Sequence, residues 1–262
     1  MKFKHFDAHT HTQFPAYDND RDAVIDCALK EGIGIINVGS EKGTSIDAVK
    51  LAHKYNNGVY ATIGLHPTDS EEGFDYEEYK KLALDEKVVA IGECGLDFFR
   101  IGSDDAEKIK AKQCEIFLEQ MRLSFEVKKP LMIHCRNAMP ELIELLKSNK
   151  EILMPGSVMH FFSGTPEEAS ELLKLGFYFT FGGVITFVSD YDETIKIIPV
   201  TSILSETDAP YVTPVPHRGK RNEPSFVVEI EKRLAELKGV TQEEMAKHII
   251  RTVGKVFSIS IE

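Results

Sequence analysis

Cysteine is scarce in this sequence, and the spacing of the few cysteines excludes the usual cysteine motifs. Four are present among 262 residues, and no two of them form a CxxC pair. We therefore expect reduced cysteines in a cytoplasmic enzyme. Cys94 and Cys135 each directly follow a polar residue at the end of an apolar run. On a strand they would point away from that residue's face, so we expect them to pack outward.

Long apolar runs are also absent, and positive charge is in deficit. No run approaches the roughly 20 residues that a membrane-spanning helix needs, and the first residues lack the apolar segment of a signal peptide. We therefore expect no membrane contact. The net charge of −11 argues against a broad basic surface that would coat nucleic acid. It does not exclude an enzyme that takes a strand end into a metal-lined pocket, because bound cations supply local positive charge.

Short apolar, β-rich runs recur along the whole chain. The polar residues that end them are spaced by about 28 residues on average, which matches one βα unit. Several runs are almost continuously apolar, as is typical of parallel strands buried on both faces. We predict an α/β fold with one domain over residues 1–262, a single and possibly distorted (β/α)8 TIM-type barrel. The predicted strands are 3–8, 33–38, 59–65, 88–93, 131–134, 157–161, 177–181 and 202–206.

Helical segments alternate with these runs, at 20–30, 44–55, 105–127, 140–148 and 166–175. The last helix begins after Thr241, which forms a capping-box pattern with Glu244. The longest insertions are 67–81 and 98–106. They follow the third and fourth strands, on the side where barrel enzymes build substrate loops.

Histidines and carboxylates stand where these strands end. His9 and His11 are two residues apart, so on a strand they face the same side and suit one metal ion. Glu93 ends a very apolar strand and needs a partner there, either an arginine or a metal. Any one of the histidines is also compatible with an ordinary hydrogen-bonded core residue. In register, however, they predict a site for Zn²⁺, Mn²⁺ or Mg²⁺ at one end of the barrel. The full set is His9, His11, Glu93, His134, His160 and Asp208.

Seven motifs together resemble one family. The chain is similar to the TatD family of metal-dependent deoxyribonucleases, in the amidohydrolase-like barrel superfamily, from residue 6 to about residue 257. Two positions depart from the family pattern: Asn137 stands where an aspartate is frequent, and Phe161 where a cysteine is usual. The motifs are DAHTH (7–11), GLHP (64–67), IGECGLDF (91–98), HCR (134–136), HFFSG (160–164), ETDAP (206–210) and PHRGKRNEP (216–224).

The resemblance implies two divalent ions, of zinc, magnesium or manganese, bridged by Glu93. His9, His11 and Asp208 would hold the first ion, and His134 and His160 the second. The implied activity is 3′-5′ exonuclease cleavage of DNA phosphodiester bonds by a metal-activated water. Glu93 and Asp208 would be the catalytic residues, with Asp208 accepting the proton of the water.

Five further residues are candidates around this site. His66 contacts a substrate phosphate or fixes its own loop, and Arg100 binds phosphate or is simply solvated. The cluster around Arg218 and Asn222 binds phosphate or locks the end of the barrel. Glu206 lies two residues before Asp208, on the same face of the predicted strand, and is expected to support the ligand pair His9 and His11.

The fold alone does not settle the substrate. We expect DNA or another phosphoester, with no obligate protein partner and a monomeric state. One alternative within the superfamily is hydrolysis of esters or amides, including removal of D-amino acids from tRNA. An alternative of another class is a non-catalytic scaffold barrel, which would hold no metal.

Overall fold

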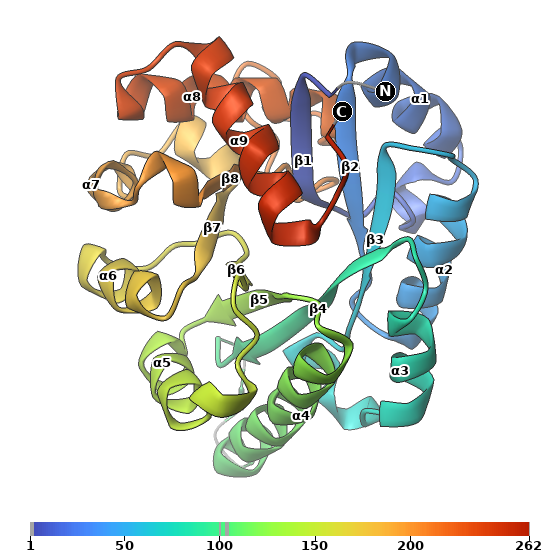
Figure 1. Ribbon diagram of the computed structural model, residues 1–262, viewed down its shortest axis with the longest axis vertical. Coiled ribbons are helices and arrows are strands. Elements are labelled where there is room, and N and C mark those ends of the chain that lie inside the picture. Colours follow the sequence, from blue (N-terminus) through green and yellow to red (C-terminus); the bar gives the residue numbers. More distant parts are fainter. Residues whose placement is uncertain (1–2, 100, 103–104, 262) are drawn as a thin grey trace.

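The computed structural model describes residues 3–99, 101–102 and 105–261. Eight parallel strands form one sheet in sequence order, and helices surround it, with α1 to α3 on one side and α5 to α7 on the other (Figure 1). This confirms the predicted barrel. The strands are β1 (His5–Thr10), β2 (Ile33–Val38), β3 (Val59–Ile63), β4 (Val88–Asp97), β5 (Leu131–Arg136), β6 (Val158–Met159), β7 (Tyr178–Phe181) and β8 (Ile203–Ser205).

Helices follow the strands in regular alternation. The predicted capping box of Thr241 and Glu244 is confirmed at the start of α9. No described helix is both long enough and apolar enough to cross a membrane. The α-helices are α1 (Arg21–Glu31), α2 (Lys42–His53), α3 (Tyr76–Ala83), α4 (Ala106–Val127), α5 (Met139–Ser148), α6 (Pro166–Lys174), α7 (Asp192–Ile197), α8 (Val227–Lys238) and α9 (Gln242–Phe257).

The segment 67–81 is not the loop that the sequence suggested. It contains a short 3-10 helix, η2 (Pro67–Glu72), and most of α3. Asp75 caps α3 by accepting a hydrogen bond from the amide of Glu78, and the helix buries Tyr79 and Ala83 against the barrel. Charged residues separate the few apolar residues of α3, so the sequence did not predict this helix.

The barrel closes irregularly between β1 and β8. Among the described residues, one isolated bridge joins Thr10 to Ala209, in place of a continuous ladder. Two backbone hydrogen bonds reinforce it, from the amide of Asp208 to the carbonyl of His9 (2.9 Å) and from the amide of His11 to the carbonyl of Ala209 (2.8 Å). The seam is therefore held by residues of the predicted metal site.

The backbones of β3, β4 and β5 approach closely beside Glu93. A Cβ atom on Gly92 would lie 2.4 Å from the carbonyl oxygen of Met132, and one on Gly64 would lie 2.6 Å from the backbone of Gly92. Gly92 also has a φ of 157°, which side chains rarely adopt. Glycine at these positions lets β4 carry Glu93 into the interior at the end of the barrel where the ligands gather.

Candidate metal centre

Glu93 stands at the centre of the site, with its two carboxylate oxygens facing different groups of histidines. All ten residues of β4 are buried, and Glu93 itself is 5% exposed. Burial raises the pKa of this carboxyl, but His66, His160 and His134 outweigh it and hold the pKa well below its usual range. Glu93 is therefore ionised, with one oxygen available to each side.

The first group surrounds Oε2 of Glu93. The Nε2 atoms of His9 and His11 lie 3.1 Å apart, and 3.6 and 3.9 Å from Oε2. Oδ1 of Asp208 lies 3.8 Å from Nε2 of His9 and 3.4 Å from Nε2 of His11. Two imidazole nitrogens and two carboxylate oxygens thus converge on one point, as a divalent cation requires.

The second group surrounds Oε1 of Glu93. Nδ1 of His134 lies 3.2 Å from this oxygen, Nε2 of His160 lies 3.5 Å from it, and Nε2 of His66 lies 3.4 Å from it. The structure thus brings all six predicted ligands together and adds His66, for which the sequence left both substrate contact and loop fixation open.

Hydrogen bonds to their other ring nitrogens set the proton positions of three histidines. His11 donates from Nδ1 to the carbonyl of Val38 (2.8 Å). His134 donates from Nε2 to Asp97 (3.0 Å), and His160 donates from Nδ1 to Glu206 (2.9 Å). In each neutral ring the nitrogen that faces Glu93 or Asp208 therefore carries a lone pair, as a metal ligand must.

His66 has the opposite arrangement. Its Nδ1 accepts a hydrogen bond from the backbone amide of Thr68 (3.2 Å) and lies 2.6 Å from the Thr68 hydroxyl. The ring proton consequently sits on Nε2, which faces Glu93. This nitrogen is a hydrogen-bond donor, so the geometry sets His66 apart from the ligand histidines and supports contact with an anionic group.

The donor set fits divalent metal ions. It consists of imidazole nitrogens and carboxylate oxygens with no thiolate, the combination that suits Zn²⁺, Mn²⁺ and Mg²⁺. Nδ1 of His9 and Oε1 of Glu206 are buried polar atoms without a hydrogen-bond partner among the described residues. Burial lowers the pKa of His160, yet Glu206 and Glu93 raise it to about 10. The carboxylates around His160 therefore favour a positive charge at this position, and a bound metal ion would provide one.

Glu206 and Asp208 reach the site without sharing a strand face, so that prediction was wrong. Glu206 also supports His160 rather than the expected pair His9 and His11. Strand β8 ends at Ser205, and Asp208 has a positive φ of 53°. Asp7 fixes this turn, since it accepts hydrogen bonds from the amide (2.8 Å) and the hydroxyl (2.6 Å) of Thr207. The turn, rather than strand alternation, aims both carboxylates at the histidines.

The supporting residues Asp97, Asp7 and Val38 were not predicted from the sequence. One signal was present for Asp97: it is four residues after Glu93 on the same strand, so the two side chains share a face. The carbonyl of Val38 leaves no trace in the sequence, because any residue type supplies one.

The predicted substrate contacts have mixed outcomes. Arg100 lies outside the described residues. Arg218 is exposed, donates to the carbonyl of Thr213 (2.8 Å) and stacks on Phe187 at 4.1 Å. Asn222 is fully buried, and its amide nitrogen donates to the carbonyls of Thr207 (2.8 Å) and Tyr211 (2.6 Å). These contacts favour the structural alternative for Asn222, because its side chain is occupied in holding the loop after β8.

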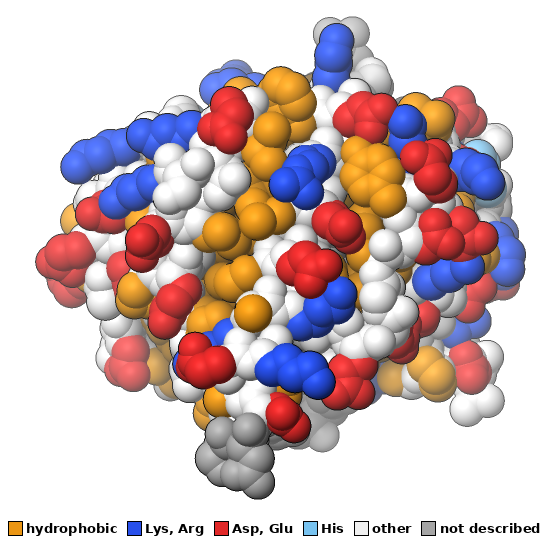
Figure 2. Space-filling view, turned by 90° about the horizontal axis from the view of Figure 1, so that it is seen from below, with side chains coloured by type: hydrophobic (Ala, Val, Ile, Leu, Met, Phe, Trp, Pro, Cys, Tyr) orange, Lys and Arg blue, Asp and Glu red, His pale blue; other side chains and the backbone are white. Residues whose placement is uncertain are grey.

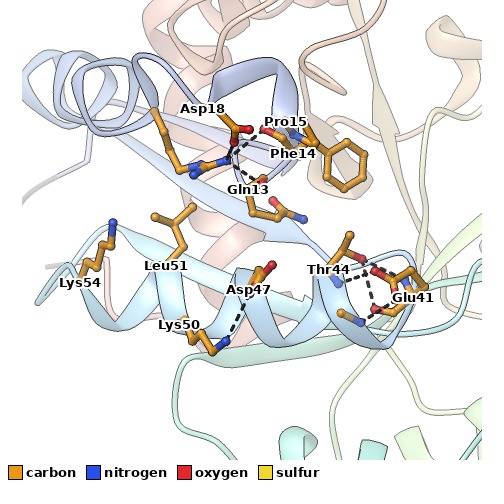
Figure 3. A pocket seen from close by; sticks show the side chains of 12 residues that line it. Gln13, Phe14, Pro15, Asp18, Glu41, Thr44, Asp47, Lys50, Leu51 and Lys54 are labelled. Atoms are coloured by element: carbon orange, nitrogen blue, oxygen red, sulfur yellow. Dashed lines mark hydrogen bonds and ion pairs between the residues drawn. The ribbon is translucent and has the colours of Figure 1, made fainter.

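A cleft of about 490 Å³ lies beside this centre, between the loop after β1 and helix α2 (Figure 3). Phe14 stacks on His11 with ring centroids 4.5 Å apart, and its side chain stands between the cleft and the metal centre. Two polar side chains of the cleft are engaged in local structure: Glu41 caps α2, and Arg21 donates hydrogen bonds to the carbonyls of Thr12 and Gln13. The histidine and carboxylate cluster, not this cleft, is the candidate active site.

The surface around the barrel carries no obvious nucleic-acid track on the face shown in Figure 2. Acidic and basic side chains are interspersed there, around a central band of hydrophobic side chains. This agrees with the acidic composition of the chain, whose net charge is −11.

Comparisons with known proteins give the chain a family. A family model described as TatD related DNase matches residues 6–258. The chain is 39% identical over 262 residues to the Bacillus subtilis protein named uncharacterized metal-dependent hydrolase YabD, covering 97% of this chain and 99% of that one. It is 34% identical over 269 residues to the Escherichia coli protein named 3′-5′ ssDNA/RNA exonuclease TatD, covering 97% and 99%.

Comparison with solved structures points to the same family. The structure of YJJV, a TatD homolog from Escherichia coli, superposes with a TM-score of 0.89 at 29% identity, and the match covers 99% of this chain and 100% of that one. The matches extend over the barrel and over every described residue of the histidine and carboxylate cluster. This chain therefore belongs to the TatD-related DNase family of metal-dependent hydrolases.

Proposed function

We propose that this protein is a 3′-5′ exonuclease that hydrolyses DNA phosphodiester bonds with two divalent metal ions. The main support is the two-sided environment of Glu93, whose oxygens face His9 and His11 on one side and His134 and His160 on the other. A carboxylate in this position suits a bridge between two ions. The name of the Escherichia coli relative gives the polarity and substrate, which this proposal carries over.

His9, His11 and Asp208 would hold one ion in this scheme, and His134 and His160 the other, with Glu93 shared. When bound, the pair would lower the pKa of a shared water toward neutrality and neutralise charge on a phosphate. Zn²⁺, Mn²⁺ and Mg²⁺ all suit the nitrogen and oxygen donors.

The protein's own groups then position the substrate and handle the proton. Asp208 accepts the proton of the attacking water, because its Oδ1 lies beside His9 and His11 and its side chain is still 17% exposed. His66 donates from Nε2 to a nonbridging phosphate oxygen, as its proton position allows. The buried walls around Glu93 exclude bulk water and strengthen each of these interactions.

A time course on single-stranded DNA labelled at its 5′ end tests the proposal. Protein freed of metal and resupplied with Mg²⁺ or Mn²⁺ should produce a ladder that shortens one nucleotide at a time. The Glu93→Gln variant should be folded and inactive, whereas Glu243→Gln, an exposed position on α9, should match the wild type. The proposal fails if the folded Glu93→Gln variant keeps near-normal rates.

Absence of cleavage with every divalent ion would also refute nuclease activity. It would redirect the search to ester and amide substrates, among them D-aminoacyl-tRNA, on the same metal centre. A protein that bound no metal at all would favour the scaffold alternative.

A further inference from the structure

Exposed aromatic side chains gather at the mouth of the barrel. In the part of the chain that the structure describes, four phenylalanine or tyrosine side chains are more than 40% exposed. Three of them lie on loops that follow β4, β7 and β8, at the end of the barrel that carries the metal centre. The fourth, Phe125, lies on the outer helix α4. The three rim residues are Phe99, Phe187 and Tyr211.

Tyr211 is fixed beside the first ligand group. Its amide donates to the carbonyl of Asp208 (2.9 Å), and its own carbonyl accepts from the buried side chain of Asn222 (2.6 Å). Its ring centroid lies 6.4 Å from that of His11, yet the residue is 52% exposed. A flat apolar surface is therefore held in place next to His11 and open to solvent.

Phe99 occupies the corresponding place beside the second ligand group. Its amide donates to Asp97 (2.9 Å), the same carboxylate that accepts from His134 (3.0 Å). The guanidinium of Arg136, at the end of β5, lies 3.6 Å from the centroid of the Phe99 ring. Phe99 is still 46% exposed, so this pair offers both an aromatic surface and a positive charge.

The two surfaces belong to loops on opposite sides of the barrel end that carries the metal centre. Tyr211 follows β8 and Phe99 follows β4, and these strands are four apart in a barrel of eight, so they lie on opposite sides of it. A phosphodiester bound over Glu93 would direct its two nucleosides toward these two sides. Unpaired bases offer both ring faces for stacking, whereas bases within a duplex already stack on their neighbours.

We propose that Tyr211 and the Phe99–Arg136 pair are stacking surfaces for the two unpaired nucleobases on either side of the scissile phosphate. This inference rests on the proposed nuclease function and adds specificity-determining residues to it. Aromatic stacking tolerates every base, so these residues select single-stranded ends rather than sequence. They also supply binding that an acidic protein cannot obtain from a basic surface.

Binding of short oligonucleotides to metal-loaded protein tests the inference. The ion is Mn²⁺, and the readout is the fluorescence anisotropy of a 5′-labelled dT8 whose 3′-terminal linkages are phosphorothioates, which resist cleavage. A second oligonucleotide has abasic residues at its two 3′-terminal positions. Phe99→Ala and Tyr211→Ala should each weaken binding of dT8 by roughly tenfold. Tyr211→Phe, which keeps the ring, should bind like the wild type, as should Phe125→Ala on the outer helix.

The abasic oligonucleotide separates stacking from other causes. Wild type, Phe99→Ala and Tyr211→Ala should bind it with similar affinity, because the partner bases are absent. Equal losses on both oligonucleotides, or no loss on either, would overturn the stacking role while wild-type cleavage of DNA left the nuclease proposal standing. A wild-type protein that neither bound nor cleaved nucleic acid would instead overturn the nuclease proposal, and this inference with it.

Discussion

Nδ1 of His160 donates a hydrogen bond to the buried carboxylate of Glu206 at 2.9 Å, and this contact turns Nε2 of the same ring toward Glu93. Asp97 does the same for His134 with the ring reversed, since it accepts from Nε2 and leaves Nδ1 facing Glu93. These two acidic residues, by bonding one ring nitrogen of each histidine, thus decide which of its nitrogens is available to a metal ion. Metal ligands held this way are oriented in advance and are more basic.

The Glu206→Gln variant should bind one of the two ions more weakly. The amide keeps the shape of the side chain but removes the negative charge that supports His160, so we expect a loss of about 10- to 100-fold in affinity for that ion. Calorimetric titration of Zn²⁺ into metal-free protein measures both sites. Asp97→Asn should weaken the same site through His134. Equal weakening of both ions, or of neither, would contradict the assignment.

Stability of the metal-free protein should fall as the pH rises from about 6.5 to about 8.5. Burial lowers the pKa values of His11, His134 and His160, but the nearby carboxylates outweigh it and raise them, for His160 to about 10. A raised histidine pKa contributes stability that is complete below the ordinary value of about 6.5 and is lost as the pH rises toward the raised value. The lowered pKa of His9 acts only below this window.

Metal ions should reverse this pH dependence, because their binding requires neutral imidazoles and releases protons. The rise in melting temperature caused by Mn²⁺ should therefore grow between the same pH values. Thermal unfolding with EDTA and with excess Mn²⁺, recorded at both ends of the range, measures the two trends. A metal-free protein that became more stable with rising pH would show that the histidines are not held protonated by Glu93, Asp97 and Glu206.

The barrel and the grouping of the six candidate ligands at one end of it could be predicted from the sequence, because both depend on regular patterns. Parallel strands buried on two faces give apolar runs, and polar residues at their ends, such as Glu93, meet at one edge. The rest depends on irregular backbone. Asp208 reaches the site through a turn after a three-residue strand, and His66 points inward because η2 follows it directly. Neither turn has a periodic signal, and the buried bonds of Asn222 appear only once the loop after β8 is folded.

Removal of the Asn222 side chain should destabilise the protein and disturb the loop that carries Tyr211. Asn222→Ala leaves the carbonyls of Thr207 and Tyr211 without their buried donor, which costs about 1–3 kcal/mol in the free energy of unfolding. Urea denaturation measures the change. Arg218→Ala removes the hydrogen bond to the carbonyl of Thr213 and the stacking on Phe187, and should change stability by less than about 1 kcal/mol because the Arg218 side chain is exposed. Similar effects of the two substitutions would refute the structural role of Asn222.

Substitution of His66 should separate substrate contact from metal binding and from loop fixation. In His66→Asn the side-chain oxygen can still accept from Thr68, whereas the donor at Nε2 is lost. We expect both ions to remain, the melting temperature to change little, and kcat on single-stranded DNA to fall by about 100-fold, as for loss of one donor to a developing charge. Thr68→Val removes the hydroxyl contact to Nδ1 and should leave kcat near the wild-type value. Loss of one bound ion in His66→Asn would instead make His66 a ligand, and equal rate losses in the two variants would make it a loop residue.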